Sequence, residues 1–274
     1  MAEWVIMNIL VASHKYNTLR DWQLNHAWDG SSSGKALFTT TSYAVGKRIG
    51  ILGYGAVGRQ VANVAQSMGM EVIAYTARPR QSQESKRHNG FSIPNTGDPE
   101  GKVPSQWFSG TGKKSLHDFL AQGMDYLLVS LPLTKVTRHL LGHEEFEILS
   151  KRNTFIINIS RGDVLQQDSL IEALHAYQDN TSSIPGQGRR GLVGAALDVA
   201  VPEPLPKDHP LWDTPNCIIS PHISGLSRDY SANAFQVLET NLQRMAEGKK
   251  LLNQIDREPG YSAVIKIGIE PECL

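Results

Sequence analysis

The stretch "ILGYGAVGRQVANVAQSMGMEVIAYTARPR", residues 51–80, decides the fold of this 274-residue chain. Within it, Gly53, Gly55 and Gly58 match the pattern G-x-G-x-x-G. Each glycine has a physical task in binding a dinucleotide: a tight turn, close approach of the backbone to the pyrophosphate, and close packing of helix on strand. A helix that starts near Ala56 would then direct its free N–H groups at the phosphates. A single match also occurs in ordinary glycine-rich turns, so the surrounding sequence decides between the two interpretations.

The surroundings are those of a strand–helix–strand unit. An apolar run at 47–55 predicts a buried strand that ends in the glycines. Apolar residues at helical spacing over 56–69 predict a helix closed by a glycine. A second apolar run at 70–76 predicts another strand. This order indicates parallel strands joined by a right-handed crossover and favours the dinucleotide interpretation.

Strand and helix patterns alternate along the rest of the chain. Further strands are predicted at 125–133, 154–160, 191–199 and 216–220. Helices are predicted at 2–28, 115–123, 143–151, 168–178 and 227–247, with Ser115 and Asp118 forming a variant capping box and Asp168 capping its helix. Composition predicts a linker at 29–35 and surface loops at 79–113 and 179–191. The alternation predicts an α/β fold with a doubly wound parallel sheet.

Composition excludes several classes of protein. Lys plus Arg and Asp plus Glu both number 27, so the formal net charge of zero gives no footprint for nucleic acid or an anionic membrane. The two cysteines, Cys217 and Cys273, are too few and too far apart for a disulfide framework or a zinc site. They fit a reducing compartment, and we expect a cytoplasmic protein without a metal. The apolar run after Glu3 is too short to span a bilayer and lacks a basic leader, so it predicts a buried helix.

The end of the second predicted strand indicates which dinucleotide is bound. An NAD site places Asp or Glu there to bind the ribose hydroxyls, but this chain has Thr76. A carboxylate would repel a 2′-phosphate, whereas Arg78 offers a planar cation that can grip phosphate in two places, and Arg80 can assist. We therefore expect NADP(H) to be preferred, with NAD(H) as the alternative. The plainer interpretation is that both arginines are solvated loop residues.

Four polar residues follow strands in the second half of the chain. Arg161 follows the strand at 154–160, Asp198 ends the next strand with Glu203 five residues later, and His222 follows the last strand. Ligands of doubly wound sheets bind beyond the carboxyl ends of the strands, so these residues point to one rim. Each alone has a plainer interpretation: a surface arginine, a loop acid between prolines, or a turn histidine.

Taken together, these motifs closely resemble the D-isomer-specific 2-hydroxyacid dehydrogenases. The resemblance runs from Ala2 to about Tyr261 and includes "GYGAVG", "LPLTKVTRHLLG", "NISRGDVL", "GAALDVAVPEPLP", "HPLW" and "SPHISG". The sequence is most similar to the glyoxylate/hydroxypyruvate reductase-like branch, whose NADP-preferring members carry a Thr-x-Arg stretch after the second strand. The resemblance implies an NAD(P)-binding Rossmann domain. It also implies hydride transfer between NADPH and a small 2-oxo acid to give a D-2-hydroxy acid.

The resemblance also assigns roles to residues. Arg161 resembles the arginine that binds the substrate carboxylate and polarises the 2-oxo group, and His222 resembles the general acid. Glu203 resembles the carboxylate that orients the imidazole and favours its charged form; the formate-oxidising relatives have glutamine there. Asp198 matches an aspartate near the nicotinamide carboxamide. The implied cofactor-binding positions are Gly53, Gly55, Ala56, Val57, Gly58, Thr76, Arg78, Leu131, Pro132, Thr137, Ile159, Arg161, Asp198 and His222.

The resemblance divides the chain into three parts. Residues 1–30 match the connecting helix that follows a substrate domain in the family, 31–223 the Rossmann domain, and 224–274 a helix and tail that return to the substrate domain. The substrate domain itself has no match in this sequence. We expect a homodimer, joined through the N-terminal helix region as in the family. We also expect the chain alone to bind NADPH but to reduce glyoxylate or hydroxypyruvate poorly.

Two other functions remain open at this point. One is a nucleotide-sensing module like the corepressors of this fold, although the sequence carries no basic tail or nuclear signal. The other is a catalytically weak cofactor-binding fragment.

Overall fold

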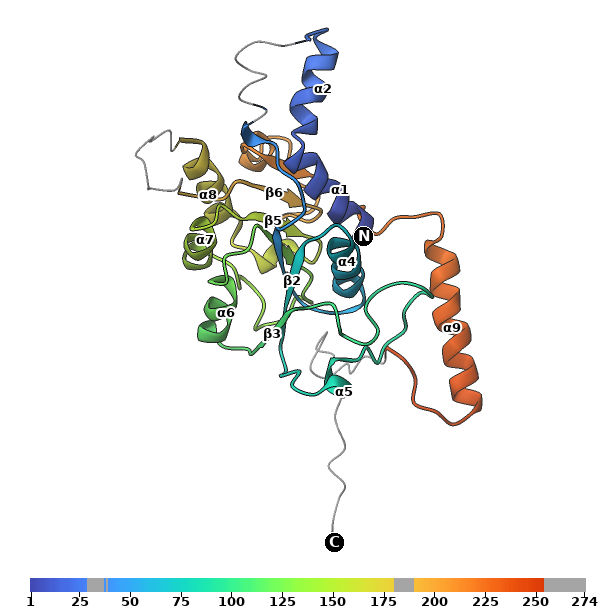
Figure 1. The fold of residues 1–274 in the computed structure, drawn as a ribbon. Helices are drawn as coiled ribbons and strands as arrows, with labels where there is room; N and C mark the ends of the chain where they lie inside the picture. The colour runs from blue at the N-terminus through green and yellow to red at the C-terminus, as the bar shows by residue number, and fades with distance from the viewer. Residues whose placement is uncertain (29–36, 38, 180–189, 254–274) are drawn as a thin grey trace.

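A seven-stranded, entirely parallel sheet forms the centre of the protein, in the order β3-β2-β1-β4-β5-β6-β7 (Figure 1). The computed structural model describes residues 1–28, 37, 39–179 and 190–253. The strands are β1 (Arg48–Leu52), β2 (Glu71–Thr76), β3 (Gln106–Ser109), β4 (Tyr126–Val129), β5 (Phe155–Asn158), β6 (Gly194–Leu197) and β7 (Cys217–Ile219). The strand order reverses between β1 and β4, as in dinucleotide-binding domains, so the predicted doubly wound sheet is confirmed.

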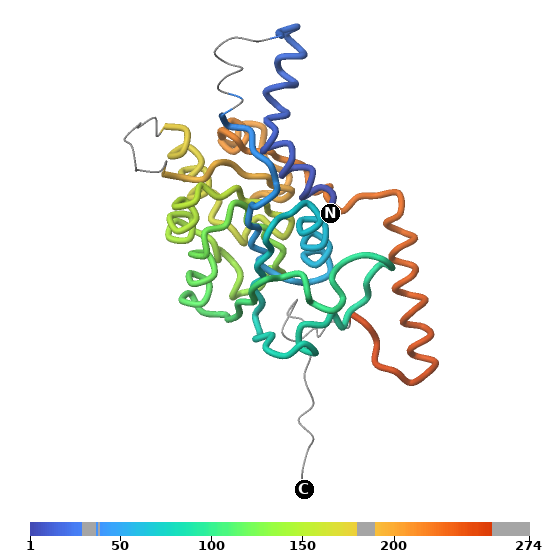
Figure 2. The backbone as a smooth tube through the Cα atoms, viewed as in Figure 1, coloured from blue at the N-terminus to red at the C-terminus, as the bar shows by residue number. Residues whose placement is uncertain are grey.

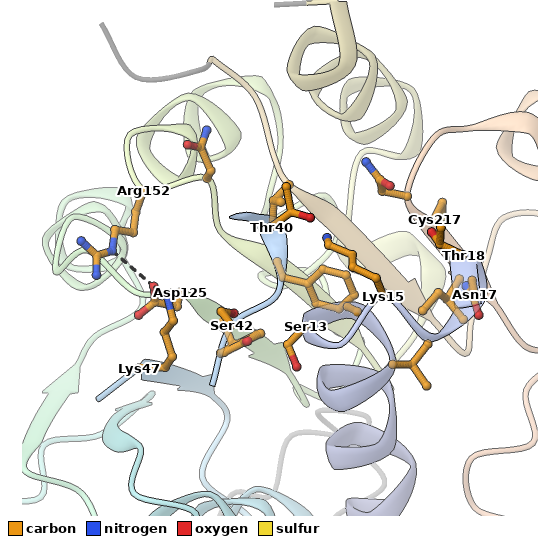
Figure 3. A pocket seen from close by; sticks show the side chains of 18 residues that line it. Ser13, Lys15, Asn17, Thr18, Thr40, Ser42, Lys47, Asp125, Arg152 and Cys217 are labelled. Carbon is orange, nitrogen blue, oxygen red and sulfur yellow. Dashed lines mark hydrogen bonds and ion pairs between the residues drawn. The ribbon is translucent and has the colours of Figure 1, made fainter. Parts of the chain in front are cut away.

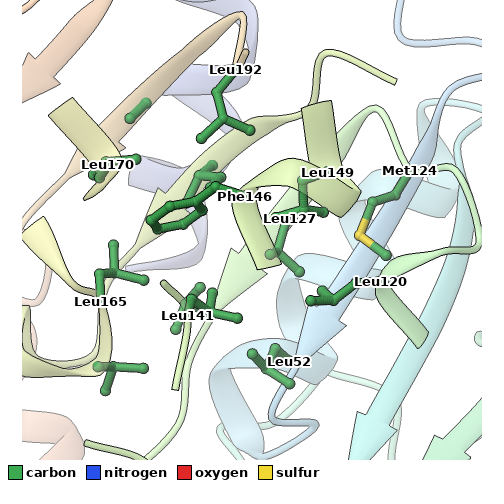
Figure 4. Close-up of a cluster of buried hydrophobic side chains, with 14 of the residues drawn as sticks. Leu52, Leu120, Met124, Leu127, Leu141, Phe146, Leu149, Leu165, Leu170 and Leu192 are labelled. Carbon is green, nitrogen blue, oxygen red and sulfur yellow. The ribbon is translucent and has the colours of Figure 1, made fainter. Parts of the chain in front are cut away.

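Helices cover both faces of this sheet. The helices that the structure describes are α1 (Ala2–Ser13), α2 (Tyr16–Leu24), α4 (Ala56–Ser67), α5 (Gln83–Lys86), α6 (Lys113–Leu120), α7 (His143–Ser150), α8 (Gln167–Asp179) and α9 (Tyr230–Ala246), with short 3-10 turns η1 (Gly162–Val164) and η2 (Pro210–Asp213). Alternate strand residues point to opposite faces, which gives two buried clusters. One cluster joins α1 and α4 to the sheet, and the other joins α6, α7 and α8 to its opposite face (Figure 4).

The glycine turn between β1 and α4 depends on close backbone approach. Gly53 has φ +102°, a conformation that side chains rarely allow, and a Cβ there would lie 2.6 Å from the Ser130 carbonyl oxygen. A Cβ on Gly58 would lie 2.6 Å from the Gly53 carbonyl oxygen and 3.0 Å from a methyl of Ile51. These two glycines therefore allow α4 to start directly against the ends of β1 and β4.

The N-terminal segment forms two helices, so the prediction of one helix over 2–28 is wrong. Lys15 breaks the segment with a left-handed backbone, φ 55°. α1 buries Val5, Ile6 and Ile9 against the sheet, whereas α2 buries none of its residues. Figures 1 and 2 show α2 projecting away from the sheet. Packing rather than helix propensity therefore decides where α1 ends.

The segment 79–113 is more ordered than the predicted surface loop. It contains α5 and the edge strand β3, which pairs with β2 from Gln106 to Ser109. Asp98, in the middle of the segment, is buried. Its carboxylate accepts hydrogen bonds from the Tyr54 hydroxyl and from the amides of Lys102 and Val103. This network fastens the segment to the residue between the first two fingerprint glycines.

Both predicted helix caps are wrong by a few residues. α6 begins at Lys113 after Gly112, and the Ser115 hydroxyl donates to the Gly112 carbonyl instead of capping the helix. α8 begins at Gln167, so Asp168 lies in its first turn, where its charge still favours the helix dipole. The predicted linker at 29–35 and nearly all of the loop at 179–191 lie outside the described residues.

The last described helix, α9, stands apart from the sheet (Figures 1 and 2). None of its residues is buried, and Phe235, Leu238 and Leu242 are each more than half exposed. Of the helices that the structure describes, none is both long enough and apolar enough to cross a membrane.

Candidate active site

A cavity of about 510 Å³ lies beyond the carboxyl ends of β1, β4 and β5. The residues that line it are Met1, Gly55, Ala56, Val57, Gly58, Ser130, Leu131, Pro132, Leu133, Ile159, Ser160 and Arg161. Eight of these are cofactor positions expected from the sequence. Four come from the start of α4, two follow β4, and two follow β5. The topology therefore gathers these eight residues, which lie up to 106 positions apart in the chain (55 to 161), around one cavity.

The cavity fits the pyrophosphate of a dinucleotide. A Cβ on Gly55 would meet nothing within 4 Å, in contrast to Gly53 and Gly58, so this glycine faces open space. Gly55 is the N-cap residue of α4 and has no side chain to accept a hydrogen bond, which leaves the N–H groups of the first turn available to a ligand. A helix N-terminus with free amides and no side chain in front of it favours an anionic group. Gly55 and Ala56 are both exposed.

The end of β2 carries positive charge and no carboxylate. Thr76 is buried, and its hydroxyl donates to the Arg78 carbonyl oxygen at 2.7 Å, so its own role is to stabilise the turn. Burial lowers the pKa of Arg80, and the nearby charge of Arg78 lowers it further. Burial also lowers the pKa of His88, with further contributions from Arg59 and Arg80. Cations therefore repel one another at this end of the site, and a negatively charged phosphate would reduce that repulsion.

Glu203 and His222 meet beyond β6 and β7. His222 Nδ1 lies 2.9 Å from Glu203 Oε2, with the two side chains 48% and 38% exposed. The other carboxylate oxygen of Glu203 accepts from the Ala200 amide at 3.0 Å, which fixes the carboxylate. His222 has φ 56°, an uncommon conformation for a residue with a side chain, and such residues cluster at functional sites. With Nδ1 facing the carboxylate, Nε2 is the nitrogen left for a substrate.

Asp198 holds the backbone on either side of His222. Its carboxylate is buried and accepts from the Ser220 hydroxyl at 2.6 Å and from the amides of Ile223 and Ser224 at 2.8 and 2.9 Å. The His222 amide donates to the Asp198 carbonyl oxygen at 2.9 Å. Burial raises the pKa of Asp198, but the hydrogen bonds from Ser220 and the following amides outweigh burial and lower it. The Asp198 carboxylate is thus engaged in hydrogen bonds that position the turn containing His222.

Arg161 connects the cavity to this turn. It is exposed, lines the cavity, and donates from one guanidinium nitrogen to the Ser160 carbonyl oxygen at 2.6 Å. The next residue, Gly162, lies so close to the Ala200 carbonyl that a Cβ would collide with it. Ala200 in turn donates its amide to Glu203. The loops that carry Arg161 and Glu203 are therefore in direct contact.

A further expected position, Thr137, is engaged within the protein, and several residues escaped the sequence reasoning. The Thr137 hydroxyl donates to the Pro132 carbonyl oxygen at 2.6 Å and shapes the turn after β4. Ser130 and Ser160 line the cavity, and Ser220 binds Asp198. Ser130 and Ser160 lie inside the predicted strands 125–133 and 154–160, and only the structure, which ends β4 at Val129 and β5 at Asn158, places them past a strand.

This sheet order, with a glycine-lined cavity beyond the strand ends, defines a dinucleotide-binding domain. The sequence matches the family model described as "D-isomer specific 2-hydroxyacid dehydrogenase, NAD binding domain" over residues 6–96 and 98–224. The chain therefore belongs to the D-isomer specific 2-hydroxyacid dehydrogenase family, a family of oxidoreductases.

Individual relatives carry related names. Glyoxylate reductase of Aeropyrum pernix is 31% identical over 214 residues, which are 78% of this chain and 52% of that protein. The human glyoxylate reductase/hydroxypyruvate reductase is 30% identical over 212 residues, which are 77% of this chain and 53% of that protein. The chain thus spans about half the length of the curated relatives that it matches.

Solved structures show the same fold. A probable 2-hydroxyacid dehydrogenase from Rhizobium etli, in complex with NADP, HEPES and tartaric acid, superposes with a TM-score of 0.67 at 25% identity. The match covers 95% of this chain and 68% of that one. A family member from Xanthobacter autotrophicus, in complex with NADPH and MES, gives a TM-score of 0.66 at 27% identity, covering 93% of this chain and 86% of that one.

Proposed function

We propose that this chain is the cofactor-binding part of an NADPH-dependent reductase of small 2-oxo acids, of the glyoxylate or hydroxypyruvate type, that forms D-2-hydroxy acids. The observation that carries the proposal is the His222–Glu203 pair, held by Asp198 beyond the carboxyl ends of β6 and β7, on the side of the parallel sheet where the glycine-lined cavity lies beyond β1, β4 and β5. Family membership and the names of the relatives agree with this chemistry.

The residues divide the chemistry between them. Bound NADPH would supply the hydride that reduces the 2-oxo carbon. Negative charge then develops on the carbonyl oxygen, and His222 donates a proton to that oxygen from Nε2. Glu203 accepts from Nδ1, which fixes the ring and favours the charged imidazolium. The Arg161 guanidinium binds the substrate carboxylate, and its planar geometry suits that group.

The preference for NADPH rests on the end of β2. A carboxylate there would repel a 2′-phosphate, and Thr76 removes that repulsion. The cations of Arg78 and Arg80 attract the phosphate, and the charge of Arg78 contributes to the lowered pKa of Arg80. The solved relatives with NADP and NADPH agree with this preference.

The domain boundaries, assembly and location belong to the same proposal. We propose residues 31–223 as the Rossmann domain, with residues 1–30 and 224–274 as segments that contact a substrate domain in the complete enzyme. The exposed apolar side chains of α9 support such a contact. A homodimer and a cytoplasmic location are also proposed, the latter in keeping with the free thiol of Cys217.

The cofactor proposal is tested by titrating the purified chain with NADPH and NADH and following the quenching of protein fluorescence. We expect NADPH to bind at least tenfold more tightly, and Arg78→Ala to remove most of that difference while leaving NADH affinity unchanged. A preference of the wild-type chain for NADH would refute the assignment.

The catalytic proposal is tested with His222→Ala in the complete enzyme. Turnover of glyoxylate should fall by at least a hundredfold, about the contribution of a general acid, with the NADPH dissociation constant unchanged. Lys207→Ala, in an exposed part of the same loop region, serves as the matched control. Unchanged turnover in His222→Ala would remove this residue from the mechanism.

A further inference from the structure

A second cavity, of about 410 Å³ (Figure 3), lies at the opposite ends of the strands from the candidate active site. It borders the amino ends of β4, β5 and β7 at Tyr126, Phe155 and Cys217. The junction between α1 and α2 closes its other side through Ser13 and Lys15. All strands run in parallel, so their amino ends lie on one side of the sheet and their carboxyl ends on the other. This cavity accordingly shares no lining residue with the glycine-lined cavity at the carboxyl ends.

The charges around this cavity do not balance. Lys15, Lys47 and Arg152 line it, with Asp125 as the one lining carboxylate. Asp125 is fully engaged: one oxygen faces Lys47 Nζ at 3.3 Å and Arg152 Nε at 3.4 Å, and the other accepts from the Arg48 amide at 2.9 Å. In Figure 3 the side chains of Asp125, Lys47 and Arg152 gather at one end of the cavity, while Lys15 extends from the end of α1. The lining therefore carries a formal excess of two positive charges.

Lys15 is the cation that lacks a counter-charge. It is half-buried, and within the described parts of the chain its ammonium group has no hydrogen-bond or ion-pair partner. Burial lowers the pKa of this lysine, because the charged form loses water without gaining an acceptor. An anion in the cavity would replace the lost water.

The backbone beside Lys15 also favours an anion. The left-handed conformation of Lys15 starts α2, a helix of nine residues whose first turn has no side-chain cap. Asn17 and Thr18, in that first turn, line the cavity. Uncapped N–H groups and the positive end of the helix dipole favour an anion at this place. Cys217 does not compete with such a ligand, because burial raises the pKa of its thiol to about 12 and keeps it neutral.

We propose that this cavity binds a small doubly charged oxyanion, of the size of a phosphate monoester or a short dicarboxylate, between Lys15, Lys47 and the first turn of α2. The two excess positive charges match a dianion, and the volume suits a ligand of a few carbon atoms.

The test is isothermal titration calorimetry of the purified chain at constant ionic strength, with inorganic phosphate and succinate as separate probes. Each titration is run with and without saturating NADPH, because phosphate can also bind at the start of α4. We expect one probe molecule per chain at a site that persists with NADPH present. Binding of phosphate alone identifies a phosphate monoester as the ligand, and binding of both probes identifies dianions in general.

Two variants assign the binding to this cavity. Lys15→Gln should weaken binding at least tenfold, whereas Lys151→Gln, which removes an exposed lysine next to Arg152 but outside the cavity, should leave it within twofold. Thr18→Asp provides a second route if Lys15→Gln fails to fold, because an acid in the first turn stabilises α2 but repels a dianion. The proposal is overturned if neither probe binds at millimolar concentration, if NADPH abolishes binding, or if the folded variants bind as the wild type does.

Discussion

At the scale of single residues, Gly55 and Gly58 belong to one motif but have opposite surroundings. Gly58 is packed between the Gly53 carbonyl and Ile51, whereas Gly55 faces open space. The motif itself gives them different tasks, close approach to the pyrophosphate for Gly55 and close helix–strand packing for Gly58. The structure separates a glycine required by the fold from a glycine required by the ligand.

This difference predicts opposite outcomes for two alanine substitutions. Gly58→Ala should lower the free energy of unfolding by about 2 kcal/mol, the typical cost of overpacking, because its Cβ has no room. Gly55→Ala should leave stability unchanged, since its φ of −86° suits alanine, but weaken NADPH binding at least tenfold. Urea denaturation and fluorescence titration measure the two effects. A Gly55→Ala variant that binds NADPH normally would show that the pyrophosphate lies elsewhere.

At the scale of elements, Asp198 links the end of β6 to the chain that follows β7. Its carboxylate receives three hydrogen bonds from residues 220–224, so it joins two strand ends at the point where His222 leaves the sheet. The hydrogen bonds lower the pKa of Asp198 in the folded protein below its ordinary value, despite burial. A depressed pKa means that this carboxylate stabilises the fold above the unfolded-state pKa and ceases to do so as the pH falls through the folded-state value.

Asp198→Asn should therefore destabilise the protein in a pH-dependent way. At pH 7 we expect a loss of about 2 kcal/mol, because an amide nitrogen would confront backbone and hydroxyl donors. Below about pH 4, where an unperturbed aspartate becomes protonated, the difference between variant and wild type should shrink. Urea unfolding between pH 3 and 7 measures it. A constant difference over this range would show that the charge of Asp198 contributes nothing, with Asp208→Asn, an exposed aspartate, as control.

The sequence predicted the elements with strong patterns and missed those set by tertiary contacts. Strands β1 and β2 and helix α4 lie where apolar spacing placed them, because their burial requires that spacing. β3 escaped because four residues between Pro104 and Gly110 form a strand only by pairing with β2. The break at Lys15 escaped because nothing in the local sequence opposes a continuous helix. The break coincides with the end of burial, since α1 has five buried residues and α2 has none.

The candidate site shows the same division. Each of Arg161, Glu203 and His222 was placed after a strand by pattern, and topology then required them to share one edge. The residues that support them were not visible in the sequence. Ser220 matters because its hydroxyl reaches Asp198, and Gly162 because it touches Ala200. Such contacts depend on side-chain geometry between segments distant in the chain.

At the scale of the whole molecule, the apolar side chains of α9 remain uncovered by the described part of the chain. Phe235, Leu238 and Leu242 are exposed by 67%, 51% and 53%. Contiguous exposed apolar surface of this kind marks an interaction site and promotes association. We expect the isolated chain to associate in a concentration-dependent manner.

Replacing these three side chains by serine should reduce that association. Sedimentation velocity over a range of concentrations measures the change. The matched control also places three serines in the same helix, but at the polar residues Gln236, Glu239 and Gln243. Equal association of the two triple variants would show that the apolar face of α9 is not responsible.

The position of Met1 has a practical consequence for anyone who prepares this protein. Met1 lines the glycine-lined cavity and packs near Gly225, three residues after His222. A purification tag fused before Met1 would be attached next to the glycine-lined cavity. A polyhistidine tag there would place imidazoles where a dinucleotide enters and would mimic competitive inhibition. Cofactor titrations should therefore be made on protein with the tag removed or carried at the other terminus.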